Sequence, residues 1–365
     1  MDEFEFGQLD LDTTDLTKDE IISLNKKMAK IIKQARENAK INKCYYCGTE
    51  NIQFCNSHSI PQFALRNIAI KGELLYTNKL MKLPFEKEEK GINEAGTFKI
   101  ICRDCDSQIF SDYENPEKYY GEITPKMLAE ISLKNYLKII SKRLVEIEMY
   151  NQAYTLTQNP INIGIINQKQ KINNIDLNEY KKSYEKAKRV SKKNWDNEYY
   201  LIYAKKLDYV VPIAFQSNLA LVCDLENNII NDIYIEDEKY KIQDIQLAIF
   251  PLKDCSIILL FMDSNNTRYR KFNKQFNKLS EDEKLEVLNY IMFLYSEDIF
   301  ISPSMEKVML DSKELIQLSK STADMIAFKD NIFKENVNYL EAVKEQFSLI
   351  NRKRIPNFLS REYAI

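Results

Sequence analysis

The sequence is poor in the residues that many hydrolases and nucleotide-binding proteins use for chemistry. Its 365 residues include one histidine and seven glycines. A single histidine cannot build a His-Glu-x-x-His motif, and neither a Ser-His-Asp arrangement nor a glycine-rich phosphate loop is present. These absences exclude most hydrolase constellations. They leave one imidazole, that of His58, for any chemistry that needs such a group.

Long apolar runs are missing as well. No stretch approaches the ~18 apolar residues that cross a bilayer. The opening Met-Asp-Glu-Phe-Glu has neither a basic start nor an apolar run, so we expect no signal peptide and a cytoplasmic protein without membrane attachment. An apolar content of 44% and a charged content of 29% are typical of a globular protein, and the length predicts two or three domains.

A net charge of −2 hides a separation of charge near the N-terminus. Residues 1–20 contain eight Asp or Glu and one Lys, whereas residues 21–43 contain seven Lys or Arg and one Glu. The two segments could pair with each other, or the acidic one could cover a phosphate-binding surface on the basic one. Two independently solvated faces would give the same pattern.

Seven cysteines are present, and four of them form two Cys-x-x-Cys pairs: Cys44, Cys47, Cys102 and Cys105. Four thiolates with this spacing predict a closed tetrahedral zinc site. A redox dithiol is the alternative, but it needs only one pair and usually lies in a βαβ context, which is absent here. The remaining three cysteines need no disulfide partner, as expected in a reducing compartment: Cys55, Cys223 and Cys255.

Periodicity predicts long helices on both sides of the cysteine-bearing segment. Thr17 and Glu20 form a capping pattern for a basic helix that runs to about residue 41. Pro125 begins a second amphipathic helix that reaches about residue 147. We expect an insertion between residues 66 and 97 to loop out, and a domain boundary near Asn159-Pro160. The predicted division is 1–41, 42–150 and 160–365.

The sequence from residue 199 onward predicts an antiparallel sheet followed by helices. Short β-branched or aromatic runs alternate with polar turns at residues 199–204, 209–215, 219–224, 229–235, 245–250 and 256–263. A capping box at Ser280–Glu283 predicts the start of a helix over residues 284–295. Basic and aromatic residues also interleave from Arg268 to Lys278. That tract fits either a nucleic-acid surface or, as we favour, an amphipathic helix with a solvated basic face.

A family resemblance rests on three short motifs. They are Ser57-His58-Ser59-Ile60-Pro61, Cys102-Arg-Asp-Cys105-Asp106 and Phe110-Ser111-Asp112-Tyr113-Glu114. Over residues 42–115 the chain resembles the HNH, or ββα-metal, nucleases that carry a zinc ribbon. It resembles most a bacterial subgroup with Cys-x-x-Cys-Asp/Glu followed by Phe-Ser-x-x-Glu. The implied fold is α+β: a zinc-ribbon ββα-metal-like module flanked by helices, then an antiparallel sheet with helices.

The resemblance implies a site and an activity. His58 would be the general base and Asp106 a ligand of a catalytic Mg²⁺ or Mn²⁺. Glu114, two turns further along the same helix as Asp106, would be a second carboxylate, with Asp112 a weaker candidate. Neutral imidazole suits a base that works near neutral pH, and a divalent ion stabilises a leaving oxygen. The implied substrate is nucleic acid, DNA rather than RNA, and fused modules of this kind often serve in defence against phage.

Two departures from the family pattern keep a second hypothesis open. Ser57 and Thr97 stand where most members carry a metal-binding Asp or His and an Asn. His58 could then cap a turn, donate to a backbone carbonyl or join zinc ligation. The chain would in that case be a non-catalytic zinc-ribbon adaptor for nucleic acid or protein. The sequence leaves open whether the partner is a second copy of the chain or another protein.

Overall fold

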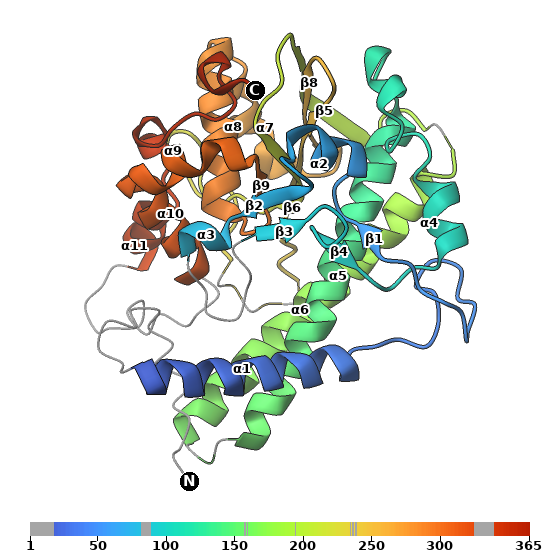
Figure 1. Cartoon of the computed structure of the whole chain (residues 1–365), viewed down its shortest axis with the longest axis vertical. Helices are drawn as coiled ribbons and strands as arrows, with labels where there is room; N and C mark the ends of the chain where they lie inside the picture. Colours follow the sequence, from blue (N-terminus) through green and yellow to red (C-terminus); the bar gives the residue numbers. More distant parts are fainter. Residues whose placement is uncertain are drawn as a thin grey trace.

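A computed structural model of the chain describes residues 18–81, 89–156, 158, 160–193, 195–233, 235, 237, 239–324 and 339–365. Its first half consists of a helix, a module of short elements and a long helical hairpin (Figure 1). The elements in this half are α1 (Lys18–Asn38), β1 (Ser57–His58), α2 (Gln62–Ile68), β2 (Glu73–Tyr76), α3 (Asn78–Met81), β3 (Glu89–Gly91), β4 (Thr97–Phe98), α4 (Arg103–Ile109), α5 (Pro125–Leu156) and α6 (Pro160–Val190).

The second half supplies most of the sheet and a layer of helices. Its strands are β5 (Tyr199–Leu207), β6 (Ile213–Leu219), β7 (Ile245–Pro251), β8 (Ser256–Asp263) and β9 (Phe300–Ile301). Its helices are α7 (Arg270–Phe276), α8 (Glu281–Tyr295), α9 (Glu306–Asp311), α10 (Lys313–Asp324) and α11 (Tyr339–Gln346). In α8 the predicted capping box is confirmed, because the Ser280 hydroxyl accepts from the Glu283 N–H while the Glu283 carboxylate accepts from the Ser280 N–H.

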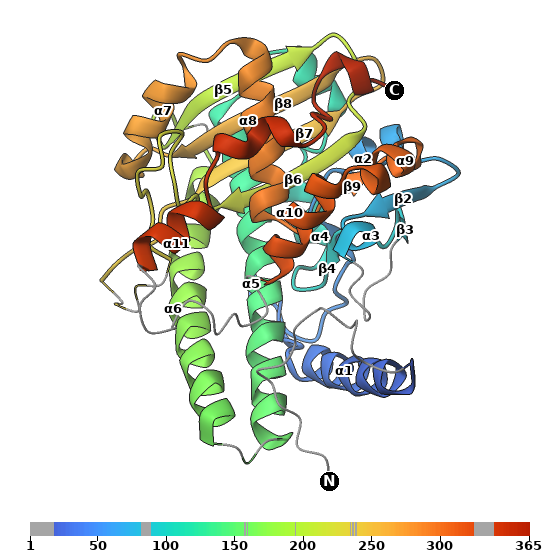
Figure 2. The same ribbon diagram turned by 90° about the vertical axis from the view of Figure 1, so that its left-hand side faces the viewer.

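Seven strands form one sheet in the order β3-β2-β9-β6-β7-β8-β5, and every pairing is antiparallel. Strand β7 shows how both faces are used. Ile245, Leu247 and Ile249 face the core that contains α8, whereas Ala248 and Phe250 face the core that contains α5. Figure 2 shows α8 across one face of the sheet, with α5 behind it. The α+β class with an antiparallel sheet is confirmed.

Two of the six predicted strands are wrong. Residues 220–224 and 229–233 lie outside the strands, and the two segments meet at an isolated bridge between Cys223 and Ile229. The Asp224 carboxylate accepts from the backbone N–H groups of Glu226 and Asn228 and so closes a tight turn between them. Side-chain hydrogen bonds of this kind compete with ladder hydrogen bonds, which the β-branched composition did not reveal.

The insertion between residues 66 and 97 does not loop out. Its strand β2 pairs with β3 on one side and with β9 on the other, at Leu75–Ile301 and Tyr76–Phe300. The module that carries the cysteines is therefore joined to the main sheet. The predicted boundary near residue 160 falls at the connection between α5 and α6, and the division into domains stays a prediction.

Helix α5 is the central support of the molecule. Every residue from Met127 to Lys138 is buried, so the helix is covered on all sides over three turns. Charged side chains lie inside this buried stretch: Glu130, Lys134 and Lys138. Buried charges require partners, and those partners come from the cysteine-bearing module and from the residues that precede β9. No helix in the described part of the chain combines the length and apolarity that crossing a bilayer requires.

Candidate metal centre and the adjacent polar cluster

The four predicted cysteines converge. The sulfur atoms of Cys44, Cys47, Cys102 and Cys105 all lie within 4.8 Å of one another. The first pair lies in a tight turn, in which the Gly48 N–H donates to the Cys44 carbonyl at 2.8 Å and Gly48 adopts a φ of 76°. The second pair begins α4, with Cys102 at its N-cap. The Cys102 N–H lies 3.4 Å from the Cys44 sulfur and connects the two halves.

These residues fit a metal ion of the zinc type. Zinc–sulfur bonds of ~2.3 Å in a tetrahedron place neighbouring sulfurs ~3.8 Å apart, which a small contraction of this cluster provides. Hydrogen bonding with Thr49 lowers the pKa of Cys47 to about 6, whereas burial raises the pKa of Cys102 and of Cys105. A metal ion beside these thiols favours their thiolate forms. Three further cysteines lie outside this group and form no disulfide: Cys55, Cys223 and Cys255. The structure therefore supports the prediction that two Cys-x-x-Cys pairs form one metal-binding group.

Two paired strands and a helix carry the residues beside the cysteines. Strand β1 pairs with β4, so that Ser57 lies opposite Phe98 and His58 opposite Thr97. Gly96 ends the intervening loop with a φ of +63°, and a side chain there would meet the Ser59 hydroxyl at 2.6 Å. Helix α4 follows β4 and brings Asp106 to β1, where the Ser57 hydroxyl donates to the Asp106 carboxylate at 2.6 Å.

A lysine from α5 completes this group. The Lys134 ammonium lies 2.8 Å from Asp106 Oδ1, 2.9 Å from Glu114 Oε1 and 3.0 Å from Ser57 Oγ. We refer to these four residues as the Lys134 cluster. The Lys134 side chain has no exposed surface, whereas those of Asp106 and Glu114 are 22% and 33% exposed. The cluster is therefore open to solvent on its carboxylate side and closed on its lysine side.

His58 adjoins the cluster and is half-buried. Its Nε2 lies 3.0 Å from the Ile92 carbonyl oxygen. Because a carbonyl oxygen only accepts, Nε2 carries the hydrogen and Nδ1 keeps its lone pair. Burial is the main cause of a lowered pKa for His58, and the charge of Lys134 acts in the same direction. The imidazole is thus neutral near pH 7 and has one nitrogen able to accept a proton.

Glu114 lies close to Asp106, as predicted, but it belongs to a turn and not to helix α4. Helix α4 ends at Ile109, so the expectation that Glu114 lies on the same helix as Asp106 is wrong. A turn follows the helix and is held by α5, where the Glu130 carboxylate accepts from the N–H groups of Asp112 and Tyr113 at 3.2 and 2.9 Å. The Asp112 side chain pairs with Lys126 at 2.8 Å and takes no part in the cluster.

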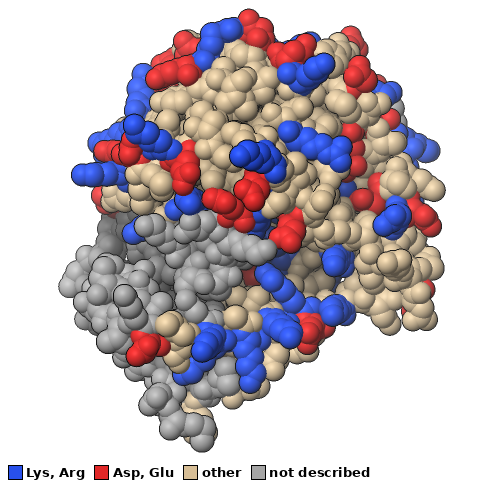
Figure 3. Space-filling view, viewed as in Figure 1, with Lys and Arg blue, Asp and Glu red and all other residues tan. Residues whose placement is uncertain are grey.

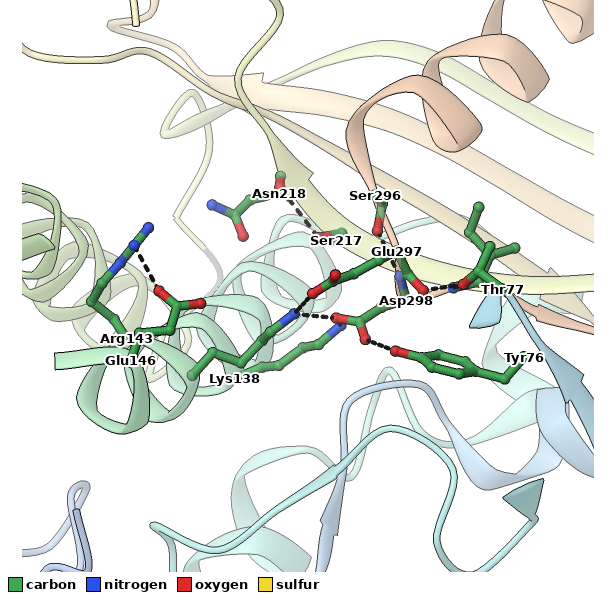
Figure 4. Close-up of polar contacts among 12 residues, drawn as sticks. Tyr76, Thr77, Lys138, Arg143, Glu146, Ser217, Asn218, Ser296, Glu297 and Asp298 are labelled. Carbon is green, nitrogen blue, oxygen red and sulfur yellow. Dashed lines mark hydrogen bonds and ion pairs between the residues drawn. The ribbon is translucent and has the colours of Figure 1, made fainter. Parts of the chain in front are cut away.

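A second, partly buried ion network lies further along α5 (Figure 4). Lys138 lies 2.7 Å from the Asp298 carboxylate, and Lys142 lies 2.7 Å from Glu297 and 3.1 Å from Asp298. The Tyr76 hydroxyl from β2 donates to Asp298 at 2.9 Å. This network joins α5, the cysteine-bearing module and the residues before β9, and so fixes the module against the sheet.

The basic and aromatic tract from Arg268 to Lys278 forms the short helix α7 and the turn before it. Its rings are fully buried: Tyr269, Phe272 and Phe276. Because these rings pack into the core, none of them can stack on a base. The tract is the amphipathic helix that we favoured over a nucleic-acid surface.

Comparisons with known proteins add no family assignment: no family model, no curated protein and no solved structure matches the chain. Residue reasoning had missed one member of the cluster, Lys134. The available signal was the spacing of four between the charged residues Glu130, Lys134 and Lys138 in a stretch of the helix that also carries Leu128, Ile131, Leu133 and Leu137. Such spacing places the three charges on one face, where each requires a buried partner.

Proposed function

We propose that this protein is an HNH-type nuclease that hydrolyses phosphodiester bonds of nucleic acid, with DNA as the expected substrate. One observation carries the proposal. The pair β1–β4 and the helix α4 follow one another beside the four-cysteine group, and the hydroxyl of Ser57, the residue before His58, donates to the Asp106 carboxylate at 2.6 Å. Two paired strands followed by a helix are the arrangement that the sequence resemblance implies.

The four cysteines would hold a structural zinc ion in this proposal. A tetrahedral site with four thiolates has no open coordination position, so the metal supports the fold and performs no chemistry. It would fix the start of α4, and with it Asp106, which directly follows the ligand Cys105. Short elements such as β1 and α4 bury too little apolar surface to hold this geometry on their own.

His58 would act as the general base. In hydrolysis, a bond forms between the water oxygen and phosphorus while the ester bond from phosphorus to the leaving oxygen breaks. The Nδ1 atom of His58 would take a proton from the water, and the leaving oxygen would gain one from solvent. Burial keeps the pKa of His58 low enough for the imidazole to be neutral at the start of this step.

The resemblance also implies a catalytic Mg²⁺ or Mn²⁺, and this stays a prediction. Carboxylate oxygens are suitable ligands for either ion. The carboxylates of Asp106 and Glu114, however, already contact the buried Lys134 ammonium. The residues present therefore do not fit a divalent ion while that lysine is charged, and no step of the mechanism is assigned to one.

A basic surface lies on the helix that leads to the cysteines. Figure 3 shows Lys and Arg side chains gathered along α1 on the lower part of this face. Exposed lysines occur there at four positions: Lys26, Lys27, Lys30 and Lys33. Such a surface attracts phosphates without reading the base sequence, as a nuclease needs for initial binding.

The experiment is a plasmid cleavage assay with the zinc-loaded protein, with and without added Mg²⁺ or Mn²⁺. His58→Gln keeps an N–H that can donate to the Ile92 carbonyl but removes the base. We expect at least a ~100-fold lower rate for this variant. Asn56→Ala, which changes an exposed neighbour bonded to the Asn93 carbonyl, serves as the control and should cleave at the wild-type rate. Equal rates for wild type and His58→Gln would refute the role of His58.

A non-catalytic zinc-ribbon adaptor is the second candidate, and a specific observation favours it. All three N–H groups of the Lys134 ammonium have an oxygen partner within the cluster, so none is left for a phosphate. An adaptor would bind nucleic acid or a protein and leave the plasmid intact under every metal condition. A role in phage defence stays a prediction for either candidate.

A further inference from the structure

The oxygens of the Lys134 cluster resemble those of a metal-cation site, but the cation that they surround is the ammonium group of Lys134. One positive group lies within hydrogen-bond distance of two carboxylates and a hydroxyl, which come from the turn after α4, from α4 itself and from β1. Three segments of the chain thus meet at one ammonium. In metal sites of the same type, a bound ion performs that joining role.

The coordination of Lys134 is complete. An ammonium has three N–H groups, and the three oxygen partners lie at 2.8, 2.9 and 3.0 Å. The ring of Phe110 covers the group with its centroid 3.7 Å from the nitrogen, and this ring is itself fully buried. The side-chain stem extends from a helix that is covered on all sides at this level. The Lys134 ammonium is therefore enclosed by its three oxygen partners, the Phe110 ring and its own helix.

A divalent ion cannot share these oxygens with the ammonium. An ion bound to Asp106 and Glu114 would lie within a few ångströms of a buried positive charge, where repulsion is weakly screened. Two carboxylates neutralise one lysine and leave a single negative charge. Without the lysine, the same oxygens carry two negative charges and attract a divalent ion strongly.

We propose that Lys134 is the resident cation of this cluster and takes the place of a divalent metal ion. It acts as a positioning residue: it fixes Asp106, Glu114 and Ser57 beside His58, and the wild-type protein binds no Mg²⁺ or Mn²⁺ there. The catalytic consequence, cleavage without added divalent ions, rests on the proposed nuclease function. The proposal that a lysine replaces the metal ion is independent of that function.

The test measures binding of Mn²⁺ alone to the zinc-loaded protein, from the electron paramagnetic resonance signal of the free ion. We expect no site in wild type that depends on Asp106, and therefore no difference between wild type and Asp106→Asn. Lys134→Met keeps the length and apolar stem of the side chain but removes the charge. This variant should gain one Mn²⁺ site per chain, and the double variant Lys134→Met/Asp106→Asn should lose it again.

Thermal unfolding gives a second measurement on the same proteins. Lys134→Met should unfold at a lower temperature than wild type in metal-free buffer, and Mn²⁺ should restore much of the difference. Wild type should show no such shift. Mn²⁺ binding to wild type that is lost in Asp106→Asn would overturn the proposal, and so would a folded Lys134→Met that gains no site.

If Lys134→Met fails to fold, the wild-type comparison still tests the proposal, because a Mn²⁺ site in wild type that depends on Asp106 would overturn it. Neither measurement contains nucleic acid, so absence of cleavage would count against the nuclease function alone. If the plasmid assay does show cleavage, the zinc-loaded protein should cleave at the same rate in buffer without Mg²⁺ or Mn²⁺ as in buffer with either ion. A rate that falls at least tenfold without Mg²⁺ or Mn²⁺, and returns with either, would contradict the catalytic consequence.

Discussion

Glu130 is a buried carboxylate that holds the turn on which Glu114 lies. Its side chain is fully buried, and its carboxylate accepts from the N–H groups of Asp112 and Tyr113. Burial raises the pKa of Glu130 to about 7, although the hydrogen bond from Tyr113 and the charge of Lys126 oppose this rise. The nearby charge of Asp112 adds to it. The carboxylate is therefore tuned by burial more than by its partners.

The raised pKa of Glu130 predicts how stability depends on pH. Between pH ~4.5 and ~7 the folded protein keeps a proton that the unfolded chain has released, so the free energy of unfolding falls as pH rises through this window. The contribution of this group is at most about 3 kcal/mol. Glu130→Gln removes the titration and should flatten the dependence, measured by urea unfolding at pH 5 and pH 8. The exposed Glu117→Gln is the control. Equal slopes for wild type and Glu130→Gln would contradict this account.

The cysteine-bearing module consists of elements too short to be stable alone. Strands β1 and β4 have two residues each, and α4 has seven with none of them buried. Order must come from the metal group at one end and from α5 at the other. This makes the metal a folding requirement for the segment that carries His58 and Asp106.

Removal of one ligand should therefore remove the zinc and disorder the segment. We expect one zinc per chain in wild type by elemental analysis, none in Cys102→Ser, and an unfolding temperature lower by several degrees or more in that variant. Cys55→Ser is a matched control, because the Cys55 thiol lies nearby and donates to the Ile101 carbonyl without joining the group. Loss of zinc from Cys55→Ser, or its retention in Cys102→Ser, would show that the ligand set is different.

Elements determined by residues close together in the sequence could be predicted, whereas those that depend on distant residues could not. The capping box at Ser280 and the start of a helix at Pro125 are set by residues within a few positions, and both predictions are confirmed. The expected amphipathic pattern and the end near residue 147 are wrong, because α5 continues to Leu156 and is buried on all sides from Met127 to Lys138. The cysteine pairs were recognisable because metal chemistry fixes their spacing. The strand predicted for residues 219–224 was wrong beyond Leu219, because the Asp224 carboxylate accepts from the N–H groups of Glu226 and Asn228 and closes a tight turn there. The role of Lys134 depends on partners 20 to 77 positions away, so no local pattern could identify them.

At the scale of the whole molecule, α5 separates two polar sites. Lys134 and Tyr136 are two residues apart and so lie on nearly opposite sides of the helix. Beyond Tyr136 lies a cavity of about 300 Å³ between α5, α6 and the end of β6. The Tyr136 hydroxyl and the Asn218 amide donate to Asp244 there, at 3.0 and 3.1 Å, and burial raises the pKa of Asp244. A shift of α5 would therefore act on both sites together.

The distribution of charge over the molecule gives a last prediction. Lys26, Lys30 and Lys33 recur at helical spacing on α1 and are exposed, as is Lys27. Replacing these four by Ala should weaken binding of a DNA duplex and reduce the slope of log K against log salt by about 0.9 for each lost phosphate contact. His58→Gln serves as the background, so that the duplex stays intact during fluorescence anisotropy measurements.

A control variant with three substitutions distinguishes an effect of the α1 surface from an effect of the overall net charge. Lys271, Lys274 and Lys278 belong to the other basic tract, whose aromatic residues are buried in the core. Replacing these three by Ala removes nearly the same total charge but should leave the slope unchanged, because that tract lacks the exposed rings of a nucleic-acid surface. Equal reductions of the slope in both variants would mean that binding follows overall charge. A reduction confined to the α1 variant would assign the phosphate contacts to the helix that leads directly into the metal group.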